Sequence, residues 1–444
     1  MPDIRTDLVY AVNGYTNTYG DIWRWNDILA TNSQIESVYA ALYTVIGRCN
    51  FLLDNAENMR KKMTDDDALD RLDVYCGEAY FARALAYSEL IKQFCKAYES
   101  DADAQNELGV VLRTHYYSDE PIKRASLYDS YQQVLSDLEL AEKALALGDD
   151  YDIAVDGYMY NSTYFNEYTV CALRARIALY MKKYDEAIKY STKVIDSGHY
   201  FLSSATQLYD SQYSYYQYMW TSDNSTEVIW KIGFTSTSYG GALGQVFFNY
   251  DYNSMKPDYV PAQWVLSLYD SNDLRYSTFF QTFTTGHTHG LTWPLLAKYW
   301  GNEGLYNEAQ LLHVSMPKVF RLSEQYLIRA EAYVMNEDFA KAGKDITTLR
   351  KARYSTYGTS TAISKDNAMK IVEEERVKEL FMEGFRLMDL KRWHKGFERT
   401  PQEQSLENGS SLVVEKDDPL FVWPIPQHEI ESPGAEIEPN ESNK

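Results

Sequence analysis

One short pattern occurs three times along this chain of 444 residues and limits what the chain can fold into. The segments FARALAY (81–87), ALRARIA (172–178) and LIRAEAY (327–333) align so that an Arg-Ala pair takes the same place in each. Two of the copies continue alike, since Tyr184 and Phe339 are each followed three residues later by alanine. This spacing predicts a recurring unit of one helix, a short turn and a second helix.

Such units predict a mostly α-helical fold with a tetratricopeptide-like scaffold of helical hairpins. Small residues let the two helices approach closely, and an aromatic ring fills the space beside them. Hydrophobic residues recur at helical spacing over 33–200 and 318–396, as Ile35 and Tyr39 do. In the first copy a long loop separates the two helices, and we expect Ser126 to cap the second one.

The segment between these stretches, 201–317, is rich in glycine, serine, threonine, tyrosine and asparagine and has few periodic runs. We expect it to form a large irregular, loop-rich lobe inserted between hairpins. Segments 1–32 and 397–444 are expected to complete the ligand-binding lobe and to supply a C-terminal packing segment. Scaffold and lobe are predicted to form a single structural unit.

The segment IVEEERVKELFMEGFRLMDLKRW, residues 371–393, predicts one helix braced by its own charges. Opposite charges stand three or four positions apart, which places them on adjacent turns. The predicted pairs are Glu374 with Lys378, Arg376 with Glu379, Glu383 with Arg386, and Asp389 with Arg392. Gly384 inside such a helix costs about 1 kcal/mol relative to alanine unless a neighbouring group must approach there.

Charge and hydropathy exclude several classes of partner. Lys and Arg number 43 against 64 Asp and Glu, a formal net charge of -21, which repels nucleic acid and anionic lipid headgroups. No apolar run approaches the length of a membrane-spanning helix. The four cysteines have no CxxC spacing and are expected to be small buried thiols. Aromatic residues make up 15% of the chain, enough to serve helix packing or a recognition surface.

Three blocks of the C-terminal part closely resemble the SusD/RagB family of outer-membrane nutrient-binding lipoproteins in Bacteroidetes. They are FRLSEQYLIRAEAYVMNEDFAKAGKDITTLRKAR (320–353), ERVKELFMEGFRLMDLKRW (375–393) and VWPIPQHEI (422–430), and they follow in that family's order and spacing. Earlier segments such as GEAYFARALAYSELIKQF (77–94) and KPDYVPAQWVLSLYDSNDLR (256–275) are similar to family segments as well. The resemblance therefore covers nearly the whole chain.

The resemblance implies a role without catalysis and without a cofactor. Family members are attached to the cell surface by an N-terminal lipidated cysteine and cap a TonB-dependent transporter of the SusC type. They pass oligosaccharides, or in the RagB branch peptides, into its barrel. This chain shows no lipobox cysteine and no export signal after Met1. We therefore expect a soluble piece that lacks the signal, the anchor and some N-terminal residues, and whose place at the outer membrane depends on that missing anchor.

A sugar ring offers an apolar face of C–H groups and a rim of hydroxyls, so proteins bind it with flat aromatic rings beside amides or acids. Three segments combine these residue types: 13–27, 211–227 and 287–304. If the stretch 211–220 is extended, alternate side chains point to two faces, and about half of the rings become core. The predicted ligand-binding residues are Tyr15, Tyr19, Trp23, Trp25, Tyr213, Tyr216, Tyr218, Trp220, Asn224, Trp293, Tyr299 and Trp300.

Other interpretations stay open. Peptide capture is the alternative within the family, and a tetratricopeptide adaptor that binds protein tails is the alternative from another class. An adaptor predicts contiguous repeats, whereas here a long lobe interrupts them. An enzyme would need Glu383 and Asp389 as a carboxylate pair, but the neighbouring arginines would keep both ionised. A metal site at His287 and His289 would lack further ligands within its loop.

Overall fold

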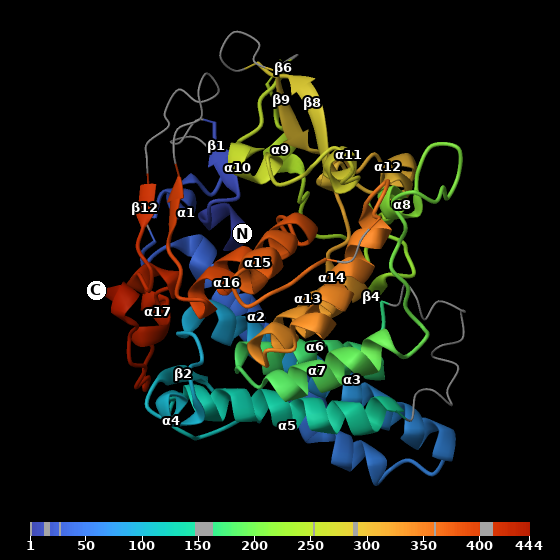
Figure 1. Ribbon diagram of the computed structural model, residues 1–444. Helices are drawn as coiled ribbons and strands as arrows, with labels where there is room; N and C mark the ends of the chain where they lie inside the picture. Colours follow the sequence, from blue (N-terminus) through green and yellow to red (C-terminus); the bar gives the residue numbers. More distant parts are fainter. Residues whose placement is uncertain are drawn as a thin grey trace.

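Antiparallel helices stacked side by side form the scaffold in the lower half of the molecule (Figure 1). The computed structural model describes residues 2–12, 18–25, 28–146, 163–251, 254–286, 292–358, 361–399 and 412–444. The longer helices are α2 (Ser33–Arg60), α3 (Asp66–Phe94), α5 (Leu127–Ala146), α6 (Glu167–Tyr180), α7 (Tyr184–Ile195), α13 (Leu322–Met335), α14 (Phe339–Arg353) and α15 (Ala368–Glu379).

Three hairpins pair α3 with α5, α6 with α7, and α13 with α14. The repeated arginine bridges two of them. Arg83 donates two hydrogen bonds to the carboxylate of Asp137 in α5, at 2.6 and 2.8 Å. Arg329 donates two to the carboxylate of Asp345 in α14, both at 2.8 Å. In the middle copy Arg174 instead reaches a glutamate of α5, in the preceding hairpin. The predicted mostly helical, tetratricopeptide-like fold is confirmed.

The first hairpin is split, as its sequence indicated. α3 ends at Phe94 and α5 begins at Leu127, and the long connection holds α4 (Asp101–Ala104) and a small sheet. The hydroxyl of Ser126 accepts a hydrogen bond from the backbone N–H of Asp129 at 2.9 Å. This contact satisfies one of the N–H groups that a helix start leaves without an intrahelical partner.

Short helices and two-stranded antiparallel sheets form the lobe above the scaffold and the C-terminal segment beside it (Figure 1). The sheets pair β1 (Val9–Ala11) with β7 (Tyr259–Pro261), β2 (Leu108–Val111) with β3 (Arg124–Ser126), β4 (Val228–Lys231) with β10 (Lys318–Arg321), β5 (Tyr250–Asp251) with β6 (Ser254–Met255), β8 (Phe280–Thr284) with β9 (Thr292–Leu296), and β11 (Phe397–Arg399) with β12 (Leu412–Val414). The short helices are α1 (Gly20–Arg24), α8 (Tyr215–Thr221), α9 (Gln245–Phe248), α10 (Gln263–Leu266), α11 (Arg275–Phe279), α12 (Glu303–Ala309), α16 (Arg386–Arg392) and α17 (Gln427–Ile430), with 3-10 turns η1 (Pro2–Arg5), η5 (Ala297–Tyr299), η6 (Pro419–Phe421) and η7 (Glu441–Asn443).

Scaffold and lobe each have a hydrophobic core. The scaffold core gathers residues of the hairpins such as Phe81 and Tyr87, and the lobe core gathers Tyr216, Trp220 and Phe279. All four cysteines are buried, which confirms the prediction of small buried thiols. No helix within the described ranges combines the length and the hydrophobicity that crossing a bilayer requires.

The prediction of one continuous helix over 371–393 is wrong. α15 ends at Glu379 and α16 begins at Arg386, and between them Gly384 has a φ of +90°, which a non-glycine residue rarely adopts. The backbone N–H of Gly384 donates to the carboxylate of Asp3 at 2.6 Å. The chain therefore turns where the N-terminal 3-10 turn packs against it.

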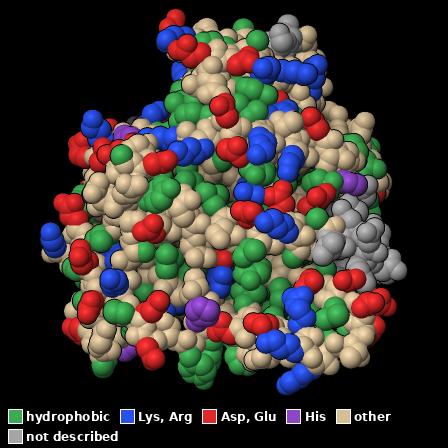
Figure 2. Space-filling model, turned by 90° about the horizontal axis from the view of Figure 1, so that it is seen from below, with side chains coloured by type: hydrophobic (Ala, Val, Ile, Leu, Met, Phe, Trp, Pro, Cys, Tyr) green, Lys and Arg blue, Asp and Glu red, His purple; other side chains and the backbone are tan. Residues whose placement is uncertain are grey.

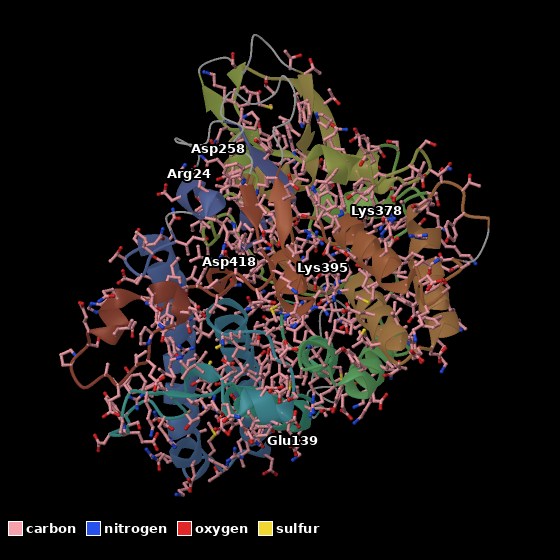
Figure 3. All side chains as sticks on the ribbon, turned by 60° about the vertical axis from the view of Figure 1, so that its left-hand side comes forward. Arg24, Glu139, Asp258, Lys378, Lys395 and Asp418 are labelled. Carbon is pink, nitrogen blue, oxygen red and sulfur yellow. The ribbon has the colours of Figure 1, made fainter. Side chains whose placement is uncertain are left out.

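This break also rearranges the predicted ion pairs. Asp389 with Arg392 is present at 2.8 Å. The other acids and bases of the segment have different partners: Arg376 pairs with Asp389 across the break, Lys378 with Glu375 and Asp273, Arg386 with Asp7, and Glu383 with Lys298 and Arg321. Lys378, labelled in Figure 3, is only 4% exposed. The segment thus fastens scaffold and lobe together.

Candidate ligand-binding site

The tyrosine-rich stretch SQYSYYQYMW is helical from Tyr215 onward and does not form an extended strand. α8 begins after Ser214, whose hydroxyl accepts from the backbone N–H of Gln217 at 3.2 Å. The side-chain oxygen of Gln217 accepts from the backbone N–H of Ser214 at 3.0 Å. These reciprocal bonds form a capping box, which fixes the start of a short helix.

Because α8 is helical, side chains three or four positions apart lie on the same face, whereas in a strand alternate side chains would do so. Tyr216, Met219 and Trp220 point into the lobe core and are buried. Tyr215 lies on the outer side and is 46% exposed, and Tyr218 is half-buried. One helix therefore supplies both core packing and an open aromatic surface.

Trp220 is enclosed by positive charge. Lys298 Nζ, Lys318 Nζ and the Arg321 guanidinium carbon lie 4.2, 4.6 and 5.2 Å from the centre of its ring. Cations over an indole face are attracted by the negative potential of the π system, and more strongly where water is excluded. The ring is only 4% exposed, so it serves as an anchor of α8 and offers no face to a ligand.

The outer side of α8 carries a compact group of tyrosines. Tyr209 stacks on Tyr218 with ring centres 3.6 Å apart and planes 17° apart, and it meets Tyr215 edge to face at 5.7 Å. Tyr209 is 46% exposed. The hydroxyl of Tyr213 donates to Glu303 at the start of α12 at 2.5 Å, and this bond raises the pKa of Tyr213 to about 12. In Figure 1, α8 and α12 lie side by side at the upper right.

Trp300, just before α12, is the second element of this surface. It is 46% exposed, and one side of its ring is supported by Phe283, with centres 5.7 Å apart and planes 6° apart. Phe248 meets it edge to face at 4.7 Å. Nδ1 of His313 lies 2.8 Å from the carbonyl oxygen of Trp300. Burial lowers the pKa of His313, so we expect a neutral ring that donates this bond.

Asn302 joins Trp300 to the end of α8. Its side-chain amide donates to the carbonyl oxygen of Ser222 and to the carboxylate of Asp223, both at 2.8 Å, while its oxygen caps α12. Contacts of Asn302 and Glu303 thus join the described part of the third predicted segment, 292–304, to the second one. We call the resulting candidate site the tyrosine–tryptophan surface: it comprises Tyr209, Tyr213, Tyr215, Tyr218 and Trp300, with Asp210, Gln212, Gln217 and Glu303 as polar neighbours.

The first predicted segment lies elsewhere. Tyr15 lies outside the described residues, and Tyr19 is half-buried at the start of α1. Trp23 and Trp25 are 2% and 5% exposed, and the indole N–H of Trp25 donates to the carbonyl oxygen of Arg5 at 2.6 Å. α1 packs on the lobe near Asp258, whose carboxylate accepts from the N–H of Thr18; Figure 3 labels Asp258 and Arg24 of α1. Trp23 and Trp25 therefore present no open ring face in this structure.

The remaining predicted residues serve packing or polar contacts. Tyr216 is fully buried, and the hydroxyl of Tyr299 donates to the carbonyl oxygen of Met382 at 3.0 Å. Trp293 is half-buried, and its indole N–H lies 3.4 Å from the carbonyl oxygen of Pro261. Asn224 accepts a long bond of 3.4 Å from Lys231. These positions support the lobe beneath the surface and contribute little open area to it.

The predicted residue list left out two exposed tyrosines of the candidate site: Tyr215, which lies in the segment 211–227, and Tyr209, which lies outside it. The capping box at Ser214 and Gln217 was a readable signal, because it predicts a helix and hence an outer face that includes Tyr215 and Tyr218. Tyr209 carried no such signal, since its stacking on Tyr218 depends on a turn closed by Tyr213, whose carbonyl oxygen accepts from the N–H of Tyr209 at 2.8 Å.

The alternative sites find less support. Burial opposes ionisation of Glu383, but Arg321 and Lys298 outweigh it and lower its pKa, and Arg376 and Arg392 do the same for Asp389. Neither carboxyl is suited to donate a proton. His287 and His289 lie outside the described residues, and the part of the chain that is described holds no group of three metal-binding side chains.

A cavity of about 630 Å³ lies beside the C-terminal segment, away from the tyrosine–tryptophan surface. Lys391, His394 and carboxylates such as Asp418, labelled in Figure 3, line it. Its one phenyl ring among the described residues, Phe421, is 2% exposed. This cavity therefore lacks the stacking faces that a sugar ring needs.

Comparisons with known sequences and structures agree with the fold. The sequence model described as the SusD family matches residues 287–435, and the one described as "starch-binding associating with outer membrane", a SusD-like family, matches residues 3–179. None of the curated proteins matches the chain.

Solved structures of similar fold come from several Bacteroides species. A SusD superfamily protein from Bacteroides thetaiotaomicron is 24% identical, with a TM-score of 0.78 over 99% of this chain and 93% of that one. A SusD superfamily protein from Bacteroides vulgatus is 21% identical, with a TM-score of 0.75 over 99% and 92%. Surface glycan-binding protein A from Bacteroides fluxus is 21% identical, with a TM-score of 0.70 over 99% and 92%. At these identities the likeness shows the fold.

Proposed function

Because this chain belongs to the SusD family, we propose that it is a non-catalytic protein of the cell surface that captures oligosaccharides on the tyrosine–tryptophan surface. It would deliver them to a TonB-dependent transporter of the SusC type. The family description names starch binding and association with the outer membrane, and one structural relative is a surface glycan-binding protein. These support a carbohydrate as the class of ligand.

The observation that carries the proposal is a set of exposed rings that the fold holds in place. Tyr209, Tyr215 and Trp300 are each 46% exposed, although burial of tyrosine and tryptophan rings is favourable. Phe283 and Phe248 support Trp300 from below, so its open face is oriented before a ligand arrives. Preorganised rings lose little conformational entropy on binding.

The polar neighbours fit the hydroxyl rim of a sugar. Exposed Asp210, Gln212 and Glu303 and the half-buried Gln217 stand among the rings and offer both acceptors and donors. A peptide ligand would be favoured by a free strand edge or a charge clamp. The described part of this surface is a helix face with mixed amides and acids, which favours a neutral saccharide.

Affinity gel electrophoresis tests this function. The chain is run through gels that contain amylopectin, arabinoxylan, galactomannan or pullulan, and affinity for the retarding polymer's oligosaccharides is measured by calorimetry. We expect Tyr215→Ala and Trp300→Ala each to weaken binding about tenfold, equal to about 1.4 kcal/mol. Tyr75→Ala, at a 49% exposed tyrosine of α3, is the matched control and should bind as the unchanged chain does. Binding of short peptides with no retardation by any polysaccharide would overturn the proposal.

A further inference from the structure

A second group of exposed rings lies on the helical scaffold, far from the tyrosine–tryptophan surface. Phe51 on α2 and Tyr116 and Tyr117 in the loop between β2 and β3 are 56%, 47% and 86% exposed. Their rings touch in series: Phe51 and Tyr116 are 5.3 Å apart at 74°, and Tyr116 and Tyr117 are 4.7 Å apart at 83°. α2 belongs to the lower helices of Figure 1, whereas α8 and α12 lie at the upper right.

The loop that carries the two tyrosines is firmly attached. Asn50 and Tyr87 both donate to the carbonyl oxygen of Arg113, at 2.8 and 2.7 Å. The hydroxyl of Tyr87 also accepts from the N–H of Arg113 at 2.7 Å. Arg83, the repeated arginine of the first hairpin, donates to the carbonyl oxygen of Thr114 at 3.2 Å. The loop therefore exposes its tyrosines while its backbone is fixed to the scaffold.

Asp54 of α2 holds the base of the ring group. Its carboxylate lies 2.8 Å from Nδ1 of His115 and accepts from the N–H of Tyr116 at 2.7 Å. Burial acts against ionisation of Asp54, but the bonds to Tyr116 and His115 outweigh it and lower its pKa. The side chain of His115 is 69% exposed, and Asn55 is exposed beside it. A charged carboxylate, an imidazole and an amide thus stand next to the open rings.

From this arrangement we propose that Phe51, Tyr116 and Tyr117 form a second carbohydrate-binding site, which holds a distant part of the same glycan chain. Tyr116 and Tyr117 meet at 83° and give a sugar an angled aromatic surface, and Asp54, Asn55 and His115 reach its hydroxyls. This inference rests on the proposed function, because the same class of ligand occupies both sites.

A protein partner fits this group less well. A stable protein interface buries on the order of 1,200 Å² or more around an apolar centre, and three rings cannot supply that area. On the lower face of the molecule, hydrophobic side chains stand in small groups between charged ones (Figure 2). The strongly acidic chain also disfavours nucleic acid and anionic lipid at this place. A neutral polymer that needs only a few rings is the ligand that remains.

Two sites on one polymer predict avidity. We expect the double variant Tyr116→Ala with Tyr117→Ala to have about tenfold or more lower affinity for the polysaccharide in the gel, since the second contact of a bivalent ligand is lost. Binding of short oligosaccharides to the tyrosine–tryptophan surface should stay within about twofold, because those ligands cannot span both sites. Tyr117→Phe keeps the ring, so this variant should be retarded as strongly as the unchanged chain. Tyr75→Ala is the control for loss of an exposed tyrosine.

The reciprocal variant separates this inference from the proposed function. Tyr215→Ala with Trp300→Ala should leave weak retardation, which the further change Tyr117→Ala removes. If Tyr215→Ala with Trp300→Ala abolishes all retardation, the second site is overturned and the proposed function stands. If only the variants at Tyr116 and Tyr117 lose retardation, the tyrosine–tryptophan surface is overturned and the second site stands. If no polysaccharide retards the unchanged chain, both fail.

Discussion

At the scale of single residues, Trp220 shows how closely this protein couples an aromatic ring to buried charge. Its indole sits among Lys298, Lys318 and Arg321, each of which is also paired with a carboxylate. Buried cations are tolerated only where such partners replace water. The ring and the charges therefore depend on each other.

Trp220→Ala is expected to lower the free energy of unfolding by about 3–5 kcal/mol, because it removes a buried ring and leaves three cations around a cavity. Urea unfolding followed by circular dichroism measures this. Trp300→Ala is the matched control, since its ring is 46% exposed and should cost less than half as much. A Trp220→Ala chain of unchanged stability that no longer binds glycan would contradict the structural role.

Lys391 is a buried cation of another kind. Its ammonium donates to the carbonyl oxygens of Lys92 and Cys95 at 2.7 and 2.8 Å, and in the described chain no carboxylate forms an ion pair with it. Burial lowers its pKa to about 7, and the nearby charges of Arg5 and Lys92 act in the same direction. The charged form is therefore disfavoured in the folded state.

The sign of the resulting pH dependence follows from proton binding. Between pH 7 and the usual lysine pKa of 10.5, the unfolded chain holds this proton and the folded chain does not, so stability rises with pH. Between pH 7 and 9 we expect the free energy of unfolding of the unchanged chain to increase by about 2 kcal/mol more than that of the Lys391→Met variant. Urea unfolding at pH 6, 7, 8 and 9 measures the difference, and parallel profiles for the two chains would refute it.

Residue types could be predicted from the sequence, but exposure could not. The composition of 211–227 and 287–304 pointed to rings and amides, and contacts at Glu303 and Asn302 join the described parts of these segments. The burial of Trp220 among Lys298, Lys318 and Arg321 could not be predicted, because no local pattern links these residues to α8. Burial of such a ring depends on partners that are distant in sequence, and hydrophobic periodicity does not predict those contacts.

At the scale of secondary-structure elements, the break between α15 and α16 is the most informative feature. Charges at three and four positions predict local pairs only if the helix continues. Gly384 instead takes a φ of +90° and donates to Asp3, a residue 381 positions away. The hairpin helices were predictable because their signals are local, whereas this turn is fixed by the far end of the chain.

Two glycine substitutions test that difference. Gly384→Ala is expected to destabilise by about 1–2 kcal/mol, since a side chain is strained at positive φ even though the space around it is open. Gly47→Ala, inside α2 with no neighbour within 4 Å, is expected to stabilise by about 0.5–1 kcal/mol. Chemical unfolding of both variants gives the answer, and a stabilising Gly384→Ala would mean that the helix can continue.

At the scale of the whole molecule, buried ion pairs join scaffold and lobe. Glu379 of α15 accepts from Arg353 of α14, from Arg321 of β10 and from Arg275 of α11, and all four side chains are 0–1% exposed. Removing one member of such a group leaves buried charge only partly compensated, which costs more than the loss of an exposed pair. Scaffold and lobe should therefore unfold together.

Acid should unfold the chain for the same reason. Burial opposes ionisation of Glu375, Glu379, Glu383 and Asp389, but neighbouring arginines and lysines outweigh it and lower all four pKa values. Below the ordinary carboxyl pKa of about 4.5 the unfolded state takes up these protons first, so stability decreases as the pH is lowered. We expect a loss of about 3 kcal/mol between pH 5 and 3.5.

Urea unfolding at pH 6, 5, 4 and 3.5 in 0.15 M salt measures this loss, with salt present so that exposed pairs are screened. Glu139→Gln, at an exposed position of α5 labelled in Figure 3, should leave the profile unchanged. Stability that stays level down to pH 3.5 would show that these carboxylates are not held ionised in the folded state.

The fold class was readable at this scale because the repeat occurs three times and each copy carries the same arginine. The three-dimensional arrangement of the lobe was not, since two of the small sheets pair strands that are distant in sequence, β1 with β7 and β4 with β10. Loop-rich segments have too few periodic residues for such pairings to be predicted.

Burial of all four thiols has a practical consequence for spectroscopy. Burial raises the pKa of Cys49 to about 11 and of Cys171 to about 12, and Cys76 and Cys95 shift in the same direction, so none presents a reactive thiolate near neutral pH. A cysteine introduced at a surface position such as Asn58, exposed on α2 near the second ring group, would then take up a maleimide dye selectively, without prior removal of the native ones. Fluorescence from that dye could follow the docking of a polymer in real time.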